Sequence, residues 1–366
     1  MTTSRTSAPT PGALGRRGLL TAIGAGLTAT VVAACTNSEL DDAEASDPTT
    51  TPAGSATADS TAAAYPVTVT HRFGETTISA EPQRVLALGQ TDCDPLLALG
   101  VVPIAVGSFV DDWYEPVHPW NESLFGGEPK EVSFTEVDFE EILALAPDLI
   151  TMVSGGITQA QYRKLSKIAP VVGPPVGYQD SAVPYGPHTL LIGQALGKEP
   201  EAQQLVDDAD AAFAAVREAH PEWASLTATH AECYSGAFDI LGANAPRTTF
   251  LVNVGFGLSE ELTDIVGDDY IMDLSAEKLD LVGALDLVVW CTDEGAIPDV
   301  QDNAVVAELA AVKAGHCIWT TYGKDDQFMW AMDWGTVLSA QHAIDLGVPL
   351  IESALAGESP ISDGNA

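Results

Sequence analysis

Residues 138–150 read DFEEILALAPDLI, and residues 275–288 repeat the same pattern as SAEKLDLVGALDLV. Each copy begins with Asp or Ser, which favour the N-cap of a helix, and continues with Glu and aliphatic residues over a short helix. Each copy then ends with Asp-Leu at the start of an apolar strand, and the second copy has one extra residue. Because this helix–strand unit occurs in two distant parts of one chain, the sequence predicts two α/β lobes of similar design.

Apolar strands and helices alternate around both copies. Buried strands interleaved with helices indicate a parallel sheet that carries helices on both faces. In the first half, strands are expected at residues 84–89, 101–106, 149–153 and 171–172, with helices at 94–99, 138–145 and 159–168. In the second half, strands are expected at 229–234, 285–291 and 316–320, with helices at 249–254, 259–266, 305–310 and 334–346.

A long amphipathic segment separates the two halves. Residues 200–219 carry apolar side chains at helical spacing, and Pro200 and Pro221 bracket them. About 20 residues make roughly 30 Å of helix, which is long enough to bridge two lobes. We therefore expect an α/β protein of two Rossmann-like lobes with parallel sheets, joined by a single long helix that allows only a small hinge motion. The lobes are assigned to residues 65–186 and 221–356, the bridging segment to 187–220 and a polar tail to 357–366.

The amino-terminal segment predicts export. Arg16 and Arg17 precede an apolar run at residues 19–34 that is short for a membrane span and rich in small residues, as in a signal peptide. The run ends in Val-Ala-Ala-Cys, which resembles a bacterial lipobox and implies that Cys35 is lipidated. An ordinary secretory signal with a chance cysteine is the alternative. The arginine pair also resembles a twin-arginine signal, although Gly15 replaces the usual Ser or Thr, so the Sec and Tat routes both stay open.

Residues 36–64 link this lipoprotein signal (residues 1–35) to the folded part. They consist mainly of Ser, Thr, Ala, Asp and Pro, which cannot bury enough apolar surface to offset the entropy of ordering. We therefore expect a disordered tether. A lipid-anchored domain on such a tether would lie at the extracellular face of the cell membrane.

The charge of the chain is strongly acidic. With 52 acidic and 15 basic residues, the net charge is −37 at pH 7. Such a surface repels nucleic acid and anionic lipid headgroups, and it weakly favours neutral or cationic solutes over polyanions. An adaptation of the surface to solubility in salt explains the same composition equally well.

The cysteines do not suggest a metal site. Cys93, Cys233, Cys291 and Cys317 are not at zinc-site spacing, so no protein-bound metal is expected. Cys291 and Cys317 lie at comparable places on successive expected strands. A disulfide between them and two buried free thiols are both consistent with the sequence.

The complete pattern resembles the class III periplasmic binding proteins, the receptors for siderophores, haem and cobalamin whose lobes are joined by one helix. The resemblance covers residues 67–355, and residues 231–251, AECYSGAFDILGANAPRTTFL, are particularly similar to actinobacterial iron-siderophore receptors. It implies a monomeric substrate-binding lipoprotein that carries a ferric siderophore, with hydroxamates favoured, to an ABC permease dimer and its ATPase. The chelator would fill the coordination sphere of the iron, so no cofactor and no protein ligand to the metal are expected.

Two other functions stay open. A haem or cobalamin receptor has the same fold, and His118 with Tyr234 could be proposed as axial ligands to haem. An extracellular two-lobed α/β enzyme is the alternative from a different class. We expect no enzyme activity, because the chain contains no Gly-x-Ser-x-Gly elbow, no His-Glu-x-x-His motif, no phosphate-binding glycine loop and no dinucleotide fingerprint.

The expected ligand site lies where the carboxyl ends of the strands of the two lobes face each other. Aromatic residues crowd these segments, and flat rings suit the apolar flanks of a ferric siderophore, although core packing is the alternative for each. Similar receptors use an arginine at the place of Arg247, whose guanidinium could donate paired hydrogen bonds to ligand oxygens or instead bind its own loop or a nearby Asp. The expected ligand contacts are Trp113, Tyr114, Tyr234, Phe238, Arg247, Phe250, Tyr322, Trp330 and Trp334.

The resemblance also gives the internal repeat a role. In this family each lobe presents one surface Glu, at the start of the repeated helix, to arginines of the permease. The matching residues are Glu140 and Glu277. Stabilisation of their own helix dipoles is the alternative explanation for two acids at these positions.

Overall fold

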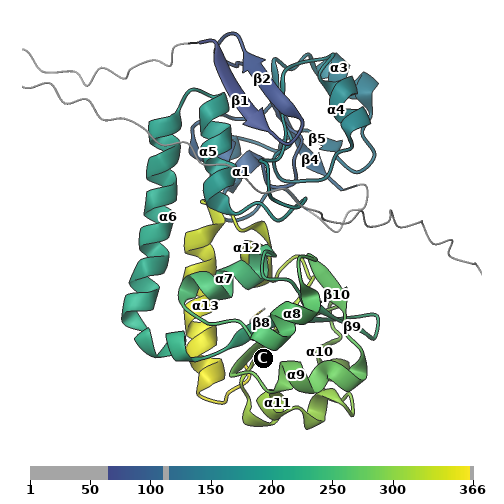
Figure 1. Ribbon diagram of the computed structural model, residues 1–366, viewed down its shortest axis with the longest axis vertical. Helices are drawn as coiled ribbons and strands as arrows, with labels where there is room; N and C mark the ends of the chain where they lie inside the picture. Colours follow the sequence, from purple (N-terminus) through teal and green to yellow (C-terminus); the bar gives the residue numbers. More distant parts are fainter. Residues whose placement is uncertain (1–64, 110–114, 363–366) are drawn as a thin grey trace, which may run out of the picture. The chain divides into compact units, whose positions relative to one another are not determined.

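The structure is a computed structural model that describes residues 65–109 and 115–362 (Figure 1). The signal peptide, Cys35 and the tether lie outside these residues, as do Trp113 and Tyr114 of the expected ligand site. Among the described helices, none combines the length and the apolar character that crossing a bilayer requires.

The first lobe contains a five-stranded parallel sheet with the strand order β5-β4-β3-β6-β7. The Asp138 side chain starts α3 by accepting hydrogen bonds from the backbone N–H groups of Glu140 and Glu141, as the repeat predicts. An antiparallel hairpin, which was not among the expected strands, adds Val69 and Ile78 to the core of this lobe. The strands are β1 (Val67–His71), β2 (Gly74–Ile78), β3 (Val85–Ala87), β4 (Ala105–Ser108), β5 (Glu131–Ser133), β6 (Leu149–Thr151) and β7 (Val171–Val172). The helices are α1 (Cys93–Ala98), α2 (Glu122–Phe125), α3 (Phe139–Leu145), α4 (Gln159–Leu165) and α5 (Tyr185–Ala195).

The second lobe contains a five-stranded sheet with the order β10-β9-β8-β11-β12. Strands β8, β11 and β12 are parallel, and helices cover both faces of the sheet (Figure 1). The strands are β8 (Ala228–Tyr234), β9 (Ala237–Leu241), β10 (Ile271–Asp273), β11 (Leu287–Thr292) and β12 (Cys317–Thr321). The α-helices are α7 (Pro246–Val254), α8 (Glu260–Val266), α9 (Leu279–Gly283), α10 (Ile297–Gln301), α11 (Ala310–Ala314), α12 (Gln327–Trp334) and α13 (Ser339–Leu355). Three short 3₁₀ helices, η1 (Pro221–Ser225), η2 (Ala276–Lys278) and η3 (Val306–Glu308), complete the lobe.

This second sheet is mixed, which corrects the expectation of a wholly parallel one. Strand β9 runs antiparallel to β8, and β10 antiparallel to β9. Ser235 and Gly236 form the two-residue turn between β8 and β9, and both have a positive φ, of 50° and 80°. A two-residue turn with positive φ at both positions matches the twist of a β-hairpin. The Ser-Gly pair was the sequence signal for this hairpin.

Helix α6 (Glu199–Ala219) joins the lobes as a single unbroken element (Figure 1). Ala202 near its start packs in the core of the first lobe, whereas Phe213 and Val216 near its end pack in the core of the second. The α/β architecture of two lobes joined by one long helix is therefore confirmed.

The described cysteines are free thiols, and all four are buried. In the parallel pair β11–β12, Cys291 lies beside Thr320 and Cys317 lies beside Val288. The two cysteines are therefore offset along neighbouring strands rather than side by side, which explains why they form no disulfide.

The expected helix at residues 334–346 is two helices. Gly335 has a φ of 53° and ends α12, and α13 begins four residues later. In the turn, the backbone N–H of Thr336 donates to Ser339 Oγ at 3.0 Å, and Ser339 N donates to Thr336 Oγ1 at 3.1 Å. This α12–α13 turn brings a polar side chain of the second lobe to the first lobe.

Candidate functional site

Aromatic rings from both lobes meet beyond the carboxyl ends of the strands. His118 of the first lobe stacks on Trp120, with ring centroids 4.4 Å apart, and its edge meets Trp334 of α12 at 4.1 Å. Trp330 lies 5.8 Å from Trp334, and its indole N–H donates to the carbonyl of Gly323 at 2.9 Å. Two of the expected ligand residues, Trp330 and Trp334, therefore form one cluster with rings of the opposite lobe.

Two further aromatic residues extend this cluster toward solvent. Tyr322 follows β12 and is half-buried, and its ring lies 6.4 Å from that of Trp330. Tyr234 ends β8, is 53% exposed, and meets Tyr322 edge-on at 6.2 Å. Tyr234, Tyr322, Trp330 and Trp334 thus form a continuous group of rings on the second lobe, here called the aromatic wall, in which Tyr234 is exposed and Trp330 and Trp334 are buried. Their contact with a ligand stays a prediction.

Phe238 and Phe250 lie away from this wall. Phe250 packs edge-on against Phe328 at 5.7 Å and belongs to the core beside α6. Phe238 meets the ring of buried Trp290 at 6.3 Å. For these two residues the structure supports core packing, because their rings fill space against the sheet of their own lobe.

His118 is a poor candidate for a haem ligand. Burial lowers its pKa to about 3, which keeps the imidazole in the neutral form that binds iron, but its ring is enclosed by Trp120 and Trp334. Tyr234, the other proposed ligand, is an exposed residue of the opposite lobe. No contact in the described part of the chain pairs the two residues.

Arg247 is buried in a network of charged and hydroxyl groups behind the wall. It is only 4% exposed. Its Nη2 lies 2.6 Å from Glu232 Oε1, its Nε lies 2.9 Å from Asp333 Oδ1, and its Nη2 donates to the Tyr322 hydroxyl at 3.1 Å. Burial alone would lower the pKa of Arg247, but Asp333, Tyr322 and Glu232 raise it well above its usual value. The pairing with a nearby Asp is therefore observed, while contact with a ligand stays a prediction.

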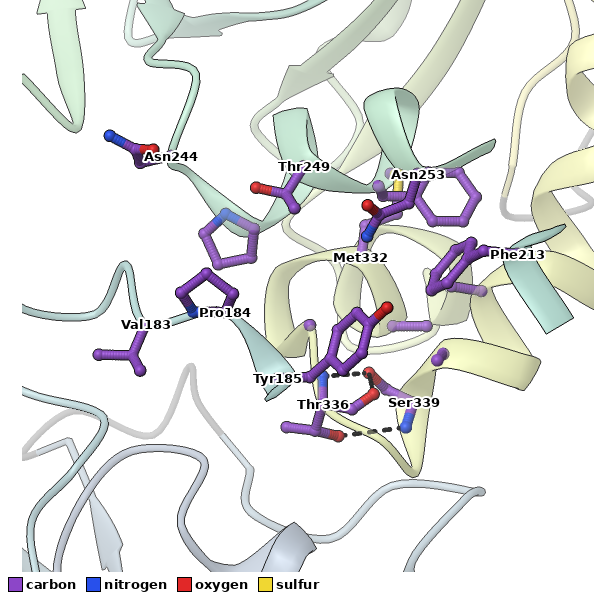
Figure 2. A pocket seen from close by; sticks show the side chains of 16 residues that line it. Val183, Pro184, Tyr185, Phe213, Asn244, Thr249, Asn253, Met332, Thr336 and Ser339 are labelled. Carbon is purple, nitrogen blue, oxygen red and sulfur yellow. Dashed lines mark hydrogen bonds between the residues drawn. The ribbon is translucent and has the colours of Figure 1, made fainter. Parts of the chain in front are cut away.

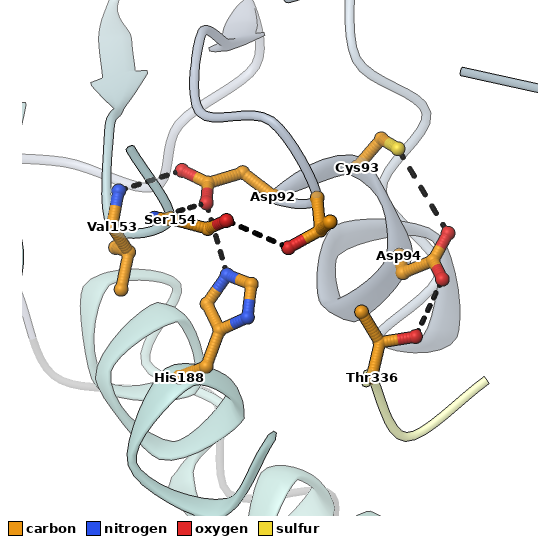
Figure 3. Close-up of polar contacts among 8 residues, drawn as sticks. Asp92, Cys93, Asp94, Val153, Ser154, His188 and Thr336 are labelled. Carbon is orange, nitrogen blue, oxygen red and sulfur yellow. Dashed lines mark hydrogen bonds and ion pairs between the residues drawn. The ribbon is translucent and has the colours of Figure 1, made fainter. Parts of the chain in front are cut away.

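Two buried aspartates hold the first lobe together near the cleft (Figure 3). Asp92 accepts hydrogen bonds from the backbone N–H groups of Val153 and Ser154, at 2.9 and 2.8 Å, and its Oδ1 lies 2.9 Å from His188 Nε2. Asp92 is fully buried. It therefore fixes the loop after β6 to the start of α1 and to α5.

Asp94 connects the two lobes. Its carboxylate accepts hydrogen bonds from Trp120 Nε1 at 2.9 Å, from Asn121 Nδ2 at 2.7 Å and from Thr336 Oγ1 of the α12–α13 turn at 2.5 Å. Burial raises the pKa of Asp94, and the donors Asn121, Thr336 and Trp120 oppose that shift. Residues 89–92, which end with Asp92, were expected to border the cleft, but neither Asp92 nor Asp94 was among the expected ligand contacts.

Two cavities lie between the lobes. One of about 150 Å³ lies beside the aromatic cluster, where Glu115 of the first lobe pairs with Lys324 of the second. The other, of about 30 Å³, lies beside α6 and is lined by Tyr185 and Phe213 (Figure 2). Pockets for small molecules usually measure about 300–1,000 Å³, so both cavities are smaller than a typical ligand pocket.

The two glutamates of the repeat are exposed at matching places. Glu140 lies in the first turn of α3, and Glu277 lies in η2 just before α9. The second copy differs in detail, because Ser275 makes no side-chain capping bond. Their contact with a permease stays a prediction.

Known proteins similar to this chain agree with the fold. A model of the periplasmic binding protein family matches residues 85–321. A periplasmic solute binding protein from Mycobacterium smegmatis is 31% identical with a TM-score of 0.69, over 79% of this chain and 98% of that chain. Staphylococcus aureus SirA complexed with staphyloferrin B is 26% identical with a TM-score of 0.61, over 76% and 96% of the two chains. The ferric-anguibactin-binding protein FatB of Vibrio anguillarum is 29% identical over 235 residues, which are 58% of this chain and 70% of FatB.

Proposed function

Because the chain belongs to the periplasmic binding protein family, we propose that it captures a ferric siderophore outside the membrane and delivers it to an ABC importer. The observation that carries this proposal is the aromatic wall of Tyr234, Tyr322, Trp330 and Trp334 at the strand ends, facing rings of the opposite lobe. The ligands named for relatives, ferric anguibactin and staphyloferrin B, support the same class of solute.

The protein binds its solute rather than transforming it. The iron stays inside its chelate, because the chelator fills the coordination sphere of the metal. Trp113 and Tyr114, which lie outside the described residues, and Arg247 are further proposed ligand contacts. Hydroxamate chelates are favoured because residues 231–251 resemble actinobacterial iron-siderophore receptors.

A siderophore needs more room than the 150 Å³ cavity gives. The exposed pair Glu115–Lys324 closes that cavity, and its rupture costs little because exposed ion pairs contribute about 0–1 kcal/mol. The buried bond between Asp94 and Thr336 and the unbroken α6 resist a larger motion. Ligand entry therefore opens the loops around Glu115 and Lys324 and leaves the lobes nearly fixed.

The receptor works as a monomer at the extracellular face of the cell membrane, where acylated Cys35 holds it near the permease dimer and its ATPase. Either Sec or Tat exports it. These features rest on the amino-terminal sequence and on the family.

Tryptophan fluorescence tests the proposal. The protein is titrated with ferric hydroxamates, ferric catecholates and haemin, with the iron-free chelators as controls. We expect saturable quenching below micromolar concentration by at least one ferric chelate, because Trp330 and Trp334 lie in the wall. A response to haemin alone would replace the siderophore by haem, and silence from every ligand would refute the proposal.

Loss of both permease glutamates should uncouple transport from binding. In the double variant Glu140→Ala/Glu277→Ala we expect uptake of the ferric chelate by cells to fall at least tenfold, because each lobe loses its carboxylate partner for the permease. Binding in solution should be unchanged, since both side chains are exposed. The matched control is Glu122→Ala/Glu260→Ala, which removes exposed acids from the first turns of α2 and α8. Equal uptake by the two double variants would contradict a docking role.

A further inference from the structure

Glu232, Asp239 and Asp273 form a row of carboxylates across three neighbouring strands of the second lobe. Glu232 faces Asp239 in the β8–β9 register, and Asp239 faces Asp273 in the β9–β10 register. Like charges directly opposite one another on a sheet are destabilising. The effect is visible at Asp239, where burial, followed by the nearby carboxylates Asp273 and Glu232, raises the pKa to about 6. The sheet thus maintains an unfavourable concentration of negative charge next to the aromatic wall.

The basic side chain that reaches this row is already shared by two acids. Arg247 pairs with Glu232 at 2.6 Å and with Asp333 at 2.9 Å. Tyr322 covers the guanidinium, whose carbon lies 5.5 Å from the centre of the ring, and the Tyr322 hydroxyl donates to Glu232 Oε1 at 2.6 Å. An anionic group in the cleft would therefore contact the Tyr322 ring, behind which the carboxylates outnumber the single guanidinium of Arg247.

Among the described residues that line the cavity between the lobes, Lys324 is the one basic side chain. Lys324 is paired with Glu115, and the adjacent Asp325 lines the same cavity. Charges in a cleft with apolar walls act on a ligand more strongly than the same charges in bulk water. The field of this cleft therefore opposes anions from both sides.

From this arrangement we infer that the cleft selects its ligand by charge, accepting neutral or cationic ferric chelates and rejecting anionic ones, and that Glu232, Asp239 and Asp273 determine this selectivity. The inference rests on the proposed function and narrows its substrate class. Specificity of this kind arises from repulsion of the wrong ligand as much as from contacts with the right one. Ferric tris-catecholates, which carry three negative charges, fall in the rejected class.

Three chelates that differ only in charge test the inference. A linear ferric trihydroxamate with a terminal ammonium group is compared with its N-acetyl form, which is neutral, and its N-succinyl form, which is anionic. We expect the wild-type protein to bind the cationic chelate at least tenfold more tightly than the anionic one at low salt. The ratio should shrink in 0.5 M salt, because salt screens the partly exposed carboxylates.

Two variants connect the selectivity to the row. In Asp239→Asn/Asp273→Asn we expect the cation-to-anion ratio to fall at least threefold, with the affinity for the neutral chelate within twofold of wild type. This variant removes repulsion within the sheet, so it should fold at least as well as wild type. Glu232→Gln should act in the same direction. The control Asp264→Asn/Asp280→Asn makes the same change in net charge at exposed sites on α8 and α9 and should leave the ratio unchanged.

The outcomes separate the two proposals. Equal affinity of the wild-type protein for the three chelates would overturn the charge selectivity. So would an equal change of the cation-to-anion affinity ratio in the Asp239/Asp273 variant and in its control. In both cases the siderophore function would stand. Binding of none of the three chelates, together with silence in the wider titration, would overturn both.

Discussion

Replacement of Asp92 by alanine is expected to lower the free energy of unfolding by about 3–5 kcal/mol, because three buried groups lose their hydrogen-bond partner at about 1–3 kcal/mol each. Asp92 is fully buried and satisfies the N–H groups of Val153 and Ser154 as well as His188. In the variant these donors lose their acceptor in a place that water does not reach. Urea denaturation followed by circular dichroism measures the change.

Two controls define the cause of that loss. Asp264→Ala removes an exposed aspartate of α8 and should change the stability by at most about 0.5 kcal/mol. Asp92→Asn keeps one acceptor oxygen and should fall between the control and Asp92→Ala. A loss below about 1 kcal/mol in Asp92→Ala would mean that water or a shifted side chain replaces the carboxylate.

Replacement of Asp94 by alanine should destabilise the protein by a similar amount, about 3–5 kcal/mol, because three buried donors lose their acceptor, and it should also loosen the joint between the lobes. Trp120, Asn121 and Thr336 all lose their acceptor, and the Thr336 bond comes from the other lobe. Small-angle X-ray scattering should show a larger radius of gyration for the ligand-free variant than for wild type.

Thr336→Val separates these two effects of Asp94. It removes the bond between the lobes and the acceptor of the Ser339 backbone N–H, and it leaves Trp120 and Asn121 paired with Asp94, so the expected loss is about 1–3 kcal/mol. Its radius of gyration should increase as in Asp94→Ala. If scattering from both variants matched wild type, α6 and the remaining contacts between the lobes, such as His118 with Trp334, would be sufficient to fix the lobes.

The architecture was predictable because short stretches of the sequence determine its helices and strands. The apolar spacing of residues 200–219 specifies α6, and the repeat at Asp138 and Ser275 specifies two related lobes. Two differences between the expected and the observed elements also have local causes in the sequence. Ser235-Gly236 makes a hairpin, which turns β9 and β10 antiparallel, and Gly335 divides one expected helix into two.

The candidate site was less predictable, because its decisive contacts join distant residues. The loop sequence identifies Arg247 as a candidate, but no residue adjacent to it in the sequence indicates that Glu232 and Asp333 pair with its guanidinium. Likewise, Asp94 and Thr336 are 242 residues apart, and only the assembled lobes bring them together. Trp330 and Trp334 belong to the aromatic wall as buried side chains, and their contact with a ligand stays a prediction, whereas Phe250 packs in the core because α7 turns it toward Phe328.

Helix α6 packs in the cores of both lobes, and this limits which changes in sequence the helix can tolerate during evolution. Each residue added to a helix turns everything beyond it by about 100° and advances it by about 1.5 Å. Ala202 belongs to one core and Phe213 to the other, so one inserted or deleted residue between them would turn one lobe away from its partner and separate Asp94 from Thr336. Natural variants of this segment should therefore accumulate substitutions on its exposed side while conserving its length, and insertions should be confined to surface loops.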